Sequence, residues 1–296
     1  METPLDPRVL ATVRALEVRA REAVRAGLGG AWSCARRGAG VEFAEVRDYV
    51  VGDDARTLDW NVSARTGRLQ VKRYDEEREQ SLLLLLDGSR STARAAGRRP
   101  WRAAAAELLT VLGWSAAQAG DRVGAAIFAR ELERWFAPRP GVTALLALVT
   151  QWLQFAGETA ATDLDAALEA VLRIRGRPLL LMVVSDMQSS ASDATLARVA
   201  ARHDLVLVAL RAGLLASLPT RGRWRFDDPE GGAQRVVDLG DRRVRAALLE
   251  RMAAAKEAAA ARATRLGAEW LELDADGDLG APLLAWARRR ALRRGR

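Results

Sequence analysis

The stretch Ser81-Leu-Leu-Leu-Leu-Leu-Asp87-Gly-Ser89-Arg-Ser91 carries five consecutive leucines that run directly into an Asp-x-Ser-x-Ser pattern. A short, unbroken apolar run is typical of a strand that is buried on both faces of a parallel sheet. Open α/β sheets bind ligands beyond the carboxyl ends of their strands, so Asp87 and the two serines are expected at a binding edge. One carboxylate and two hydroxyls are hard oxygen ligands, which suit Mg²⁺ better than zinc or copper.

The segments after this strand alternate between helical and extended patterns. Helices are predicted at 100–119, 142–153, 163–172, 193–202, 241–266 and 280–294, and strands at 121–128, 179–184, 204–210, 235–238 and 268–273. Residues 131–136 are predicted to form a hairpin partner at one edge of the sheet. Because helices and strands alternate, the predicted fold class is α/β, with a mostly parallel sheet flanked by helices and right-handed crossovers.

The residues before the leucine strand follow a different pattern. An amphipathic helix is predicted over 6–26, ended by the glycines of 27–30 and followed by an irregular basic segment, 31–39. Residues 41–65 show no clear helical or strand period, and 68–79 is predicted to be an exposed, charged strand. We therefore divide the chain into an N-terminal extension with helical and irregular or β segments, residues 1–78, and an α/β domain, residues 79–296.

Composition limits the classes of function. The chain has 46 basic and 38 acidic residues, a formal net charge of +8, and acids interspersed almost throughout. The only dense basic cluster in the sequence is Arg288–Arg290 with Arg293 and Arg294. Because basic residues are not concentrated elsewhere, nucleic-acid binding is not favoured. A single cysteine, Cys34, allows no intrachain disulfide and indicates a reducing compartment. No secretory signal and no apolar stretch near the ~20 residues of a membrane span is visible, which predicts a soluble, cytoplasmic protein.

Hard oxygen ligands recur at three predicted strand edges or loops. Asp87 with its two serines, Thr162 with Asp163, and Ser185 with Asp186 should all meet on one side of a parallel sheet. This pattern resembles the metal-ion-dependent adhesion site of the von Willebrand factor A domain. The resemblance implies that one divalent cation, Mg²⁺ or Mn²⁺, is held directly or through water by Asp87, Ser89, Ser91, Thr162 and Asp186. Thr159 is the alternative to Thr162.

A second pattern, Gly52-Asp53-Asp54-x-Arg56-x-x-Asp59-Trp60 followed by Ser63-Ala64-Arg65, precedes the leucine strand. It resembles the signature of an uncharacterised bacterial family of von Willebrand factor A-like proteins that are typically encoded beside MoxR-type AAA+ ATPases. With the metal motifs, the likeness extends over roughly residues 38–210. It implies a von Willebrand factor A-like fold, a MoxR-type ATPase as partner, and a role as adaptor or co-chaperone that binds an acidic residue of its partner.

The acids of this second pattern allow two interpretations. Asp53, Asp54 or Asp59 could serve as the base of a metal-dependent hydrolase. Alternatively, Arg56 and Arg65 pair with these acids in a buried network that fixes an irregular loop, because arginine bonds carboxylates in a bidentate manner. We favour the structural network and a protein that is not an enzyme. The single histidine, His203, lies at a predicted strand start, and Trp60 and Trp224 lie in predicted loops where they could face a partner.

Overall fold

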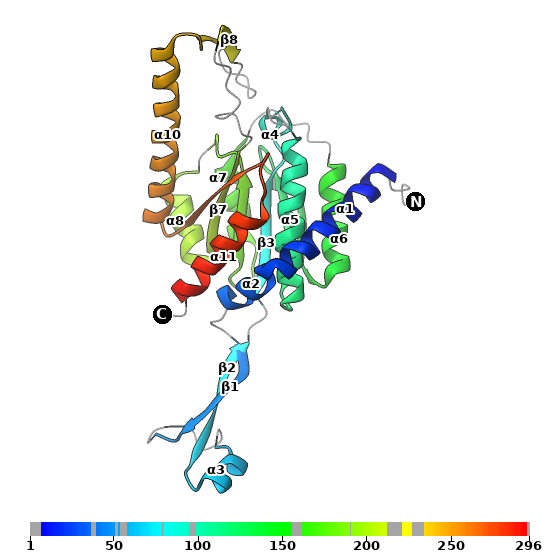
Figure 1. The fold of residues 1–296 in the computed structure, drawn as a ribbon, viewed down its shortest axis with the longest axis vertical. Helices are drawn as coiled ribbons and strands as arrows, with labels where there is room; N and C mark the ends of the chain where they lie inside the picture. Colours follow the sequence, from blue (N-terminus) through cyan, green and yellow to red (C-terminus); the bar gives the residue numbers. More distant parts are fainter. Residues whose placement is uncertain are drawn as a thin grey trace.

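A six-stranded sheet forms the centre of the molecule (Figure 1). The structure is a computed structural model that describes residues 7–36, 40–50, 53, 58–77, 80–94, 99–155, 162–189, 191–211, 221–226 and 234–294. The strand order is β10-β7-β6-β3-β4-β5, and every neighbouring pair is parallel except β4 and β5, which are antiparallel. The predicted α/β class, the mostly parallel sheet and the edge hairpin are therefore confirmed.

The elements of this α/β body follow the predicted order. The strands are β3 (Ser81–Asp87), β4 (Arg122–Phe128), β5 (Leu132–Pro140), β6 (Leu180–Ser185), β7 (Asp204–Arg211) and β10 (Glu269–Asp274). The helices are α4 (Arg90–Arg94), α5 (Trp101–Gln118), α6 (Val142–Gln154), α7 (Leu164–Arg173), α8 (Asp193–Arg202), α10 (Arg242–Arg265) and α11 (Gly280–Arg294). The short helix α4, which begins inside the Asp-x-Ser-x-Ser pattern, was not predicted.

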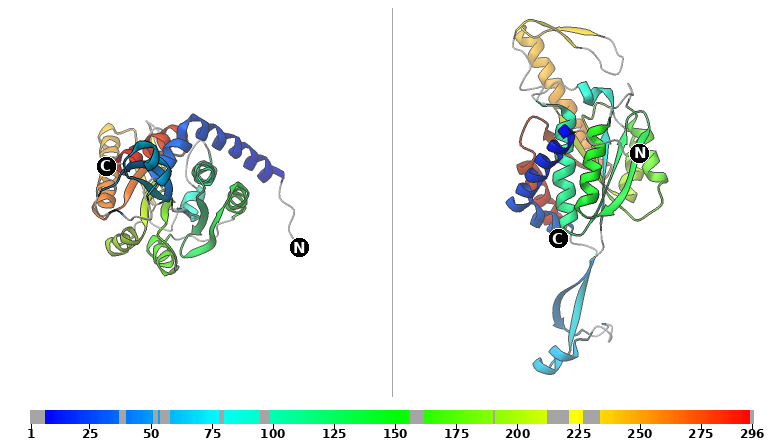
Figure 2. Two further views of the ribbon diagram at one scale, coloured as in Figure 1. Left: turned by 90° about the horizontal axis from the view of Figure 1, so that it is seen from below. Right: turned by 90° about the vertical axis from the view of Figure 1, so that its right-hand side faces the viewer.

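Two hydrophobic cores lie on the two faces of β3. Leu82, Leu84 and Leu86 pack in one core with apolar residues of α5, α6 and α11, whereas Leu83 and Leu85 pack in the other with residues of α7 and α8. All five leucines are at most 1% exposed. Figure 2 shows these helix layers on either side of the sheet. The unbroken leucine run is therefore explained by its position at the centre of the sheet, where neither face is open to water.

The N-terminal helix continues past the glycines, contrary to the prediction. α1 (Pro7–Ala23) passes through a π-helical turn (Val24–Leu28) into α2 (Gly29–Arg36). Gly27 makes the kink with φ of 111°, a value that glycine adopts without steric cost. Leu28 and Trp32 are buried in the same core as α5, and the Trp32 indole donates to Asp121 at 3.1 Å. This burial outweighs the weak helix propensity of the glycines, so residues 31–36 are helical rather than irregular.

An arm projects from the body (Figure 1). It consists of an antiparallel hairpin, β1 (Gly40–Asp48) with β2 (Gln70–Glu77), and of α3 (Trp60–Thr66) near the end of the hairpin. The prediction that residues 41–65 lack regular structure is wrong for β1 and α3. The hairpin lies outside the central sheet, so its strands need no long apolar runs of the kind that marked β3 and β6.

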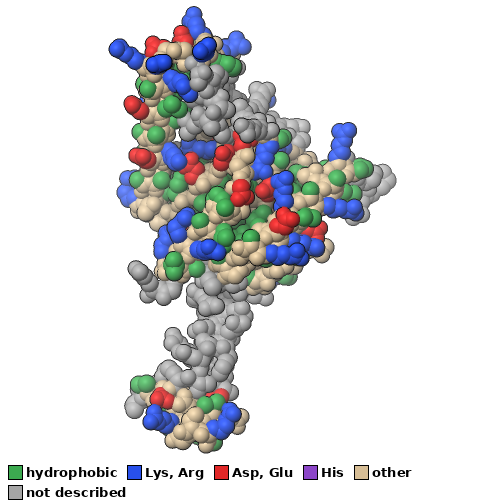
Figure 3. All heavy atoms as spheres, in the orientation of Figure 1, with side chains coloured by type: hydrophobic (Ala, Val, Ile, Leu, Met, Phe, Trp, Pro, Cys, Tyr) green, Lys and Arg blue, Asp and Glu red, His purple; other side chains and the backbone are tan. Residues whose placement is uncertain are grey.

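A second hairpin pairs β8 (Arg223–Phe226) with β9 (Arg235–Asp238) near the start of α10. Strand β9 was predicted, whereas β8 lies in a segment that was predicted as loop. Basic and acidic side chains are mixed over the face of the molecule seen in Figure 3, as the interspersed sequence suggests. Throughout the described ranges, every helix is too short or too polar to cross a bilayer.

His203 is a structural residue of this fold. It ends α8, is 5% exposed, and accepts a hydrogen bond at Nδ1 from the Leu179 amide at 3.2 Å. Burial lowers the pKa of the His203 imidazole from its usual value, and the positive charge of Arg202 lowers it further. The predicted position at a strand start is therefore confirmed, since His203 directly precedes β7.

Stability should consequently fall as pH is lowered from 7.5 towards 5.5. The unfolded state takes up a proton near pH ~6.5, whereas folded His203 stays neutral to lower pH, so acid favours the unfolded state. Thermal unfolding across this range should show a falling midpoint. His203→Asn, which retains an acceptor for the Leu179 amide, should show a flatter profile because the chain then has no histidine. Parallel profiles for the two proteins would contradict the assignment.

Candidate metal centre

Strand β3 lies at the point where the order in which strands are added to the sheet reverses. Its neighbour on one side is β4, the next strand in the chain, and its neighbour on the other side is β6, which follows later. Crevices at such switch points, beyond the carboxyl ends of the strands, are the usual ligand sites of open α/β sheets. Asp87 is the last residue of β3 and Ser185 is the last residue of β6, so both lie at this edge.

Asp87 is the centre of a buried hydrogen-bond cluster. Its side chain is fully buried, its Oδ2 accepts a 2.6 Å bond from the Ser185 hydroxyl, and its Oδ1 accepts a 3.0 Å bond from the Ser89 amide. The Ser185 hydroxyl accepts in turn from the Met187 amide at 3.1 Å. Because a buried carboxylate is costly unless it is bonded, these contacts explain how Asp87 is tolerated between two apolar strands.

The two serines of the Asp-x-Ser-x-Ser pattern bring their hydroxyls together. Ser89 is fully buried, Ser91 is 6% exposed, and their Oγ atoms share a hydrogen bond at 2.9 Å. Thr92 holds the turn by donating to the carbonyls of Asp87 and Ser89 at 3.1 and 2.9 Å. Neighbouring ligands of an octahedral Mg²⁺ with bonds of ~2.1 Å lie about 3 Å apart. The spacing and the oxygen chemistry of the residues present therefore fit a magnesium-like ion.

Gly88 is the residue that allows this turn to lie close to its neighbours. A Cβ atom added there would come within 2.6 Å of Phe155 Cε1 and 2.8 Å of Ile127 Cγ2. The Gly88 amide also donates to the carbonyl of Phe128 at 2.7 Å. A side chain at position 88 would thus push the turn away from β4 and from the end of α6.

Thr162 and Asp186 lie on two loops that follow other elements of the α/β body. Asp186 follows Ser185 directly, and its Oδ1 accepts a 3.0 Å bond from the Gln188 amide. The Ser189 hydroxyl donates to the carbonyl of Thr162 at 3.3 Å, which joins the two loops. Asp163 caps α7 at the predicted helix start, accepting from the Ala166 amide at 2.9 Å. Thr159 lies outside the described residues.

Sequence reasoning gave no specific role to two residues at this edge. Ser185 was placed there, but its bond to Asp87 joins residues that are 98 positions apart in the chain. Arg102, near the start of α5, donates from Nη2 to the carbonyl of Gly88 at 3.2 Å and from Nη1 to the carbonyl of Phe155. Burial lowers the pKa of the Arg102 guanidinium, and the negative charge of Asp87 opposes this shift. No periodic pattern marks either contact.

Hydroxyls, rather than a set of three carboxylates, define this centre. Among the described residues, no three His, Cys, Asp or Glu side chains converge in a way that would hold a metal ion. The predicted ligand set contains only two carboxylates, those of Asp87 and Asp186, and takes its other oxygens from serine and threonine. The edge therefore offers few formal charges and several neutral hydroxyl oxygens.

The acids of the second sequence pattern lie on the arm. Asp59 caps α3, accepting from the amides of Asn61 and Val62 at 3.0 and 3.2 Å, and Asp53 accepts from the Val50 amide at 2.9 Å. Trp60 is 67% exposed, and Arg65 lies exposed in the last turn of α3. Asp54 and Arg56, the remaining residues of the predicted network, lie outside the described residues.

The structure does not bring these arm acids to the Asp87 edge. The arm precedes Ser81, at the start of β3, whereas Asp87 is at the other end of the same strand. A seven-residue strand spans about 20 Å. Asp53 and Asp59 therefore stabilise the backbone of the arm at a distance from the hydroxyl cluster.

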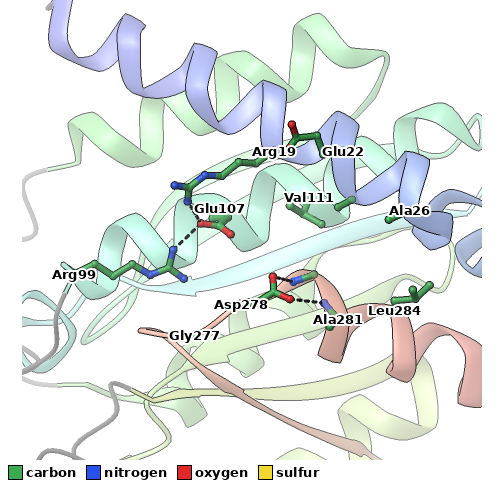
Figure 4. Close-up of a pocket in the computed structure, with 12 residues that line it drawn as sticks. Arg19, Glu22, Ala26, Arg99, Glu107, Val111, Gly277, Asp278, Ala281 and Leu284 are labelled. Atoms are coloured by element: carbon green, nitrogen blue, oxygen red, sulfur yellow. Dashed lines mark hydrogen bonds and ion pairs between the residues drawn. The ribbon is translucent and has the colours of Figure 1, made fainter.

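A pocket of about 550 Å³ lies elsewhere, between α1, α5 and the start of α11 (Figure 4). Glu107 receives hydrogen bonds from Arg19 at 2.7 Å and from Arg99 at 2.6 Å. Asp278 accepts from the amides of Gly280 and Ala281 at the start of α11. The Arg19–Glu107 pair attaches α1 to α5, and Asp278 caps the start of α11, so the pocket lies between helices rather than at the sheet edge.

The sequence profile of the family described as "Protein of unknown function DUF58" matches residues 45–259. The chain belongs to the DUF58 family. The DUF58 match includes part of the arm, the Asp87 edge of β3, and the Ser185 edge of β6.

Relatives of this DUF58 protein occur in mycobacteria. "Uncharacterized protein Mb1516" of Mycobacterium bovis and "Uncharacterized protein Rv1480" of Mycobacterium tuberculosis are each 30% identical over 299 residues. Each alignment covers 98% of this chain and 92% of the relative.

Similar solved structures include two proteins from Bacteroides species. An aerotolerance-related membrane protein from Bacteroides fragilis aligns with a TM-score of 0.47 and 14% identity, covering 72% of this chain and 99% of that one. The conserved hypothetical protein BatB from Bacteroides thetaiotaomicron aligns with a TM-score of 0.44 and 13% identity, covering 73% of this chain and 98% of that one.

Proposed function

We propose that this DUF58 protein is a metal-dependent protein-binding module with a von Willebrand factor A-like fold. The edge of β3 and β6 holds one Mg²⁺ or Mn²⁺ through Asp87, Ser89, Ser91, Thr162 and Asp186. The observation that carries this proposal is the buried cluster in which Asp87 is bonded while the Ser89 and Ser91 hydroxyls lie 2.9 Å apart. Such a cluster supplies hard oxygens at the edge where α/β sheets bind ligands.

The ligand chemistry favours a carboxylate from a partner. Asp87 and Asp186 carry two formal negative charges, which only balance a divalent ion, and hydroxyls supply the other oxygens. An octahedral ion held this way keeps room for an oxygen from outside. An acidic residue of a partner protein would fill that position. By the family resemblance, the partner is a MoxR-type AAA+ ATPase, for which this chain acts as adaptor or co-chaperone.

A hydrolase is the less favoured alternative. Hydrolysis at this edge would need a base near the ion, and Asp53 and Asp59 instead bond backbone amides on the arm. His203 lies at the start of β7, at the edge of the sheet opposite to Asp87. The binding role therefore accounts for more of the geometry than a catalytic role does.

Capture of the ATPase should depend on both the ion and its ligands. Asp186→Ala and Ser89→Ala are each expected to abolish capture, because loss of the ion removes the partner's desolvated carboxylate contact, which contributes about 2–5 kcal/mol. EDTA should have the same effect on the wild type. Affinity capture from cells, read by mass spectrometry, measures this, with circular dichroism as the check on folding.

Ser115→Ala is the matched control for the serine variant. Ser115 is fully buried, and its hydroxyl donates within α5 to the carbonyl of Val111 at 2.9 Å. It should leave capture of the ATPase intact. If the complex survives chelation and both site substitutions, the proposed mode of binding is wrong.

A further inference from the structure

Arg102 is held rigidly beside the candidate metal centre. Its guanidinium donates to the carbonyl of Gly88, next to Asp87, and to the carbonyl of Phe155, at the end of α6. Its Cζ atom lies 5.5 Å from the Trp152 ring centroid and 5.4 Å from the Phe155 ring centroid. The Trp152 indole in turn donates to the Arg102 carbonyl at 3.0 Å. Arg102 thus joins the loop after β3 to the C-terminal end of α6.

The same contacts place a permanent positive charge next to the buried carboxylate. Arginine stays protonated in proteins, so its charge is present whether or not a cation is bound. The formal charges of Asp87, Asp186 and Arg102 together sum to −1, whereas the two carboxylates alone would give −2. A divalent ion would then bring the edge to +1 rather than to neutrality. Like charges repel more strongly where water is excluded, as around Asp87.

We propose that Arg102 sets the charge of the metal centre: it weakens the binding of a free divalent cation and gives the loaded site a positive charge that an anionic group completes. This inference rests on the proposed function, and it adds a reason for the choice of an acidic partner. Cation and carboxylate then bind cooperatively, because each relieves the unfavourable charge that the other leaves. Arg102 acts through the charge and the loop position and is not itself a ligand.

Calorimetric titration of Mn²⁺ into the purified protein tests the charge effect. Arg102→Gln is expected to bind Mn²⁺ about tenfold more tightly than the wild type, because a nearby positive charge is gone. Arg102→Lys keeps the charge but loses the forked hydrogen bonds, and it should stay within about twofold of the wild type. A purely structural role predicts the opposite sign, with both variants binding Mn²⁺ more weakly.

Arg202→Gln is the matched control for loss of an arginine that donates to two backbone carbonyls. Arg202 also donates to two backbone carbonyls, those of Leu172 and Ile174, at the end of α7. It lies just before β7, at the opposite edge of the sheet, so its removal should leave Mn²⁺ affinity unchanged. If Arg102→Gln does not fold, Arg102→Met carries the same expectation, because methionine keeps an apolar stem against Trp152 and Phe155.

Acetate serves as the probe for the anionic group. Wild-type Mn²⁺ affinity should be higher in sodium acetate than in sodium chloride at equal ionic strength. The ratio of the affinity in acetate to the affinity in chloride should be smaller for Arg102→Gln than for the wild type. Complexation of Mn²⁺ by acetate in solution affects both titrations alike. Equal ratios in the two proteins, or Mn²⁺ affinity in folded Arg102→Gln no tighter than wild type, would overturn this inference. Absence of Mn²⁺ binding to the wild type would instead overturn the proposed function itself.

Discussion

Asparagine in place of Asp87 is expected to weaken Mg²⁺ and Mn²⁺ binding by at least ~100-fold, while the protein remains folded. Loss of residues that merely orient a metal ligand costs about 10–100-fold in affinity, so loss of a charged ligand should cost more. Asp87 is also bonded to Ser89 and Ser185, which makes it the residue on which the whole cluster depends. Titration calorimetry of the two proteins measures the difference.

The folded state should tolerate this change for a physical reason. The amide has the shape of the carboxylate, and the Ser185 hydroxyl can rotate to accept rather than donate a hydrogen bond. Removal of a buried charge also removes its desolvation cost, so the thermal midpoint without metal should be near that of the wild type. Asp163→Asn is the control, since asparagine caps α7 as well as aspartate does. Equal heats of Mn²⁺ binding from Asp87→Asn and wild type would refute the assignment.

The second large effect is on stability: Arg290→Ala should lower the free energy of unfolding by about 3 kcal/mol, near the lower end of the range for breaking a buried pair. The Arg290 side chain is 3% exposed, donates to Asp204, and places Nη1 3.0 Å from Glu269 Oε2. These ion pairs therefore connect α11 to the starts of β7 and β10. The two carboxylates keep about a quarter of their exposure, which moderates the cost of leaving them unpaired.

Arg293→Ala provides the comparison within the same helix. Arg293 is 62% exposed and lies 3.7 Å from Glu269 Oε1, so its loss should cost at most ~0.5 kcal/mol. Urea unfolding of both variants gives the two free energies. Similar losses for Arg290→Ala and Arg293→Ala would contradict the buried-pair explanation.

Long apolar runs made the sheet predictable. The leucines of β3 and the run in β6 have to be apolar at every position because helices cover both of their faces. Asp87 breaks the apolar pattern of β3 where the strand ends, and the rule for the carboxyl ends of parallel strands then placed it at a ligand edge. The cap of α7 by Asp163 was equally predictable, because it is a local contact between near neighbours.

Contacts between distant residues were not predictable from one sequence. The bond from Ser185 to Asp87, the clamp by Arg102, and the pairing of Arg290 with Asp204 depend on how separate elements pack. Arg290 even belongs to the basic cluster of the last helix, where its neighbours suggest an exposed role. Helix α2 was missed because tertiary burial of Trp32 outweighs the glycines before it.

The second sequence pattern contains local backbone contacts that were not foreseen. Asp59 caps α3 and Asp53 bonds a turn amide, which is a structural role of the kind that we favoured over a catalytic base. An Asp at the start of a short helix is a common cap, and the unclear period of the segment concealed the helix. The exposure of Trp60 agrees with the expectation that this side chain could face a partner. The predicted pairing through Arg56 stays a prediction.

The most direct test of a metal centre at the β3 edge is anomalous scattering from a crystal of the protein grown with Mn²⁺. The proposal predicts one strong peak within bonding distance of the Ser89 and Ser91 hydroxyls, and loss of that peak in crystals of Asp87→Asn. A peak confined to the acidic loop at Asp274, Asp276 and Asp278 after β10, or no peak at the Asp87 edge, would contradict it.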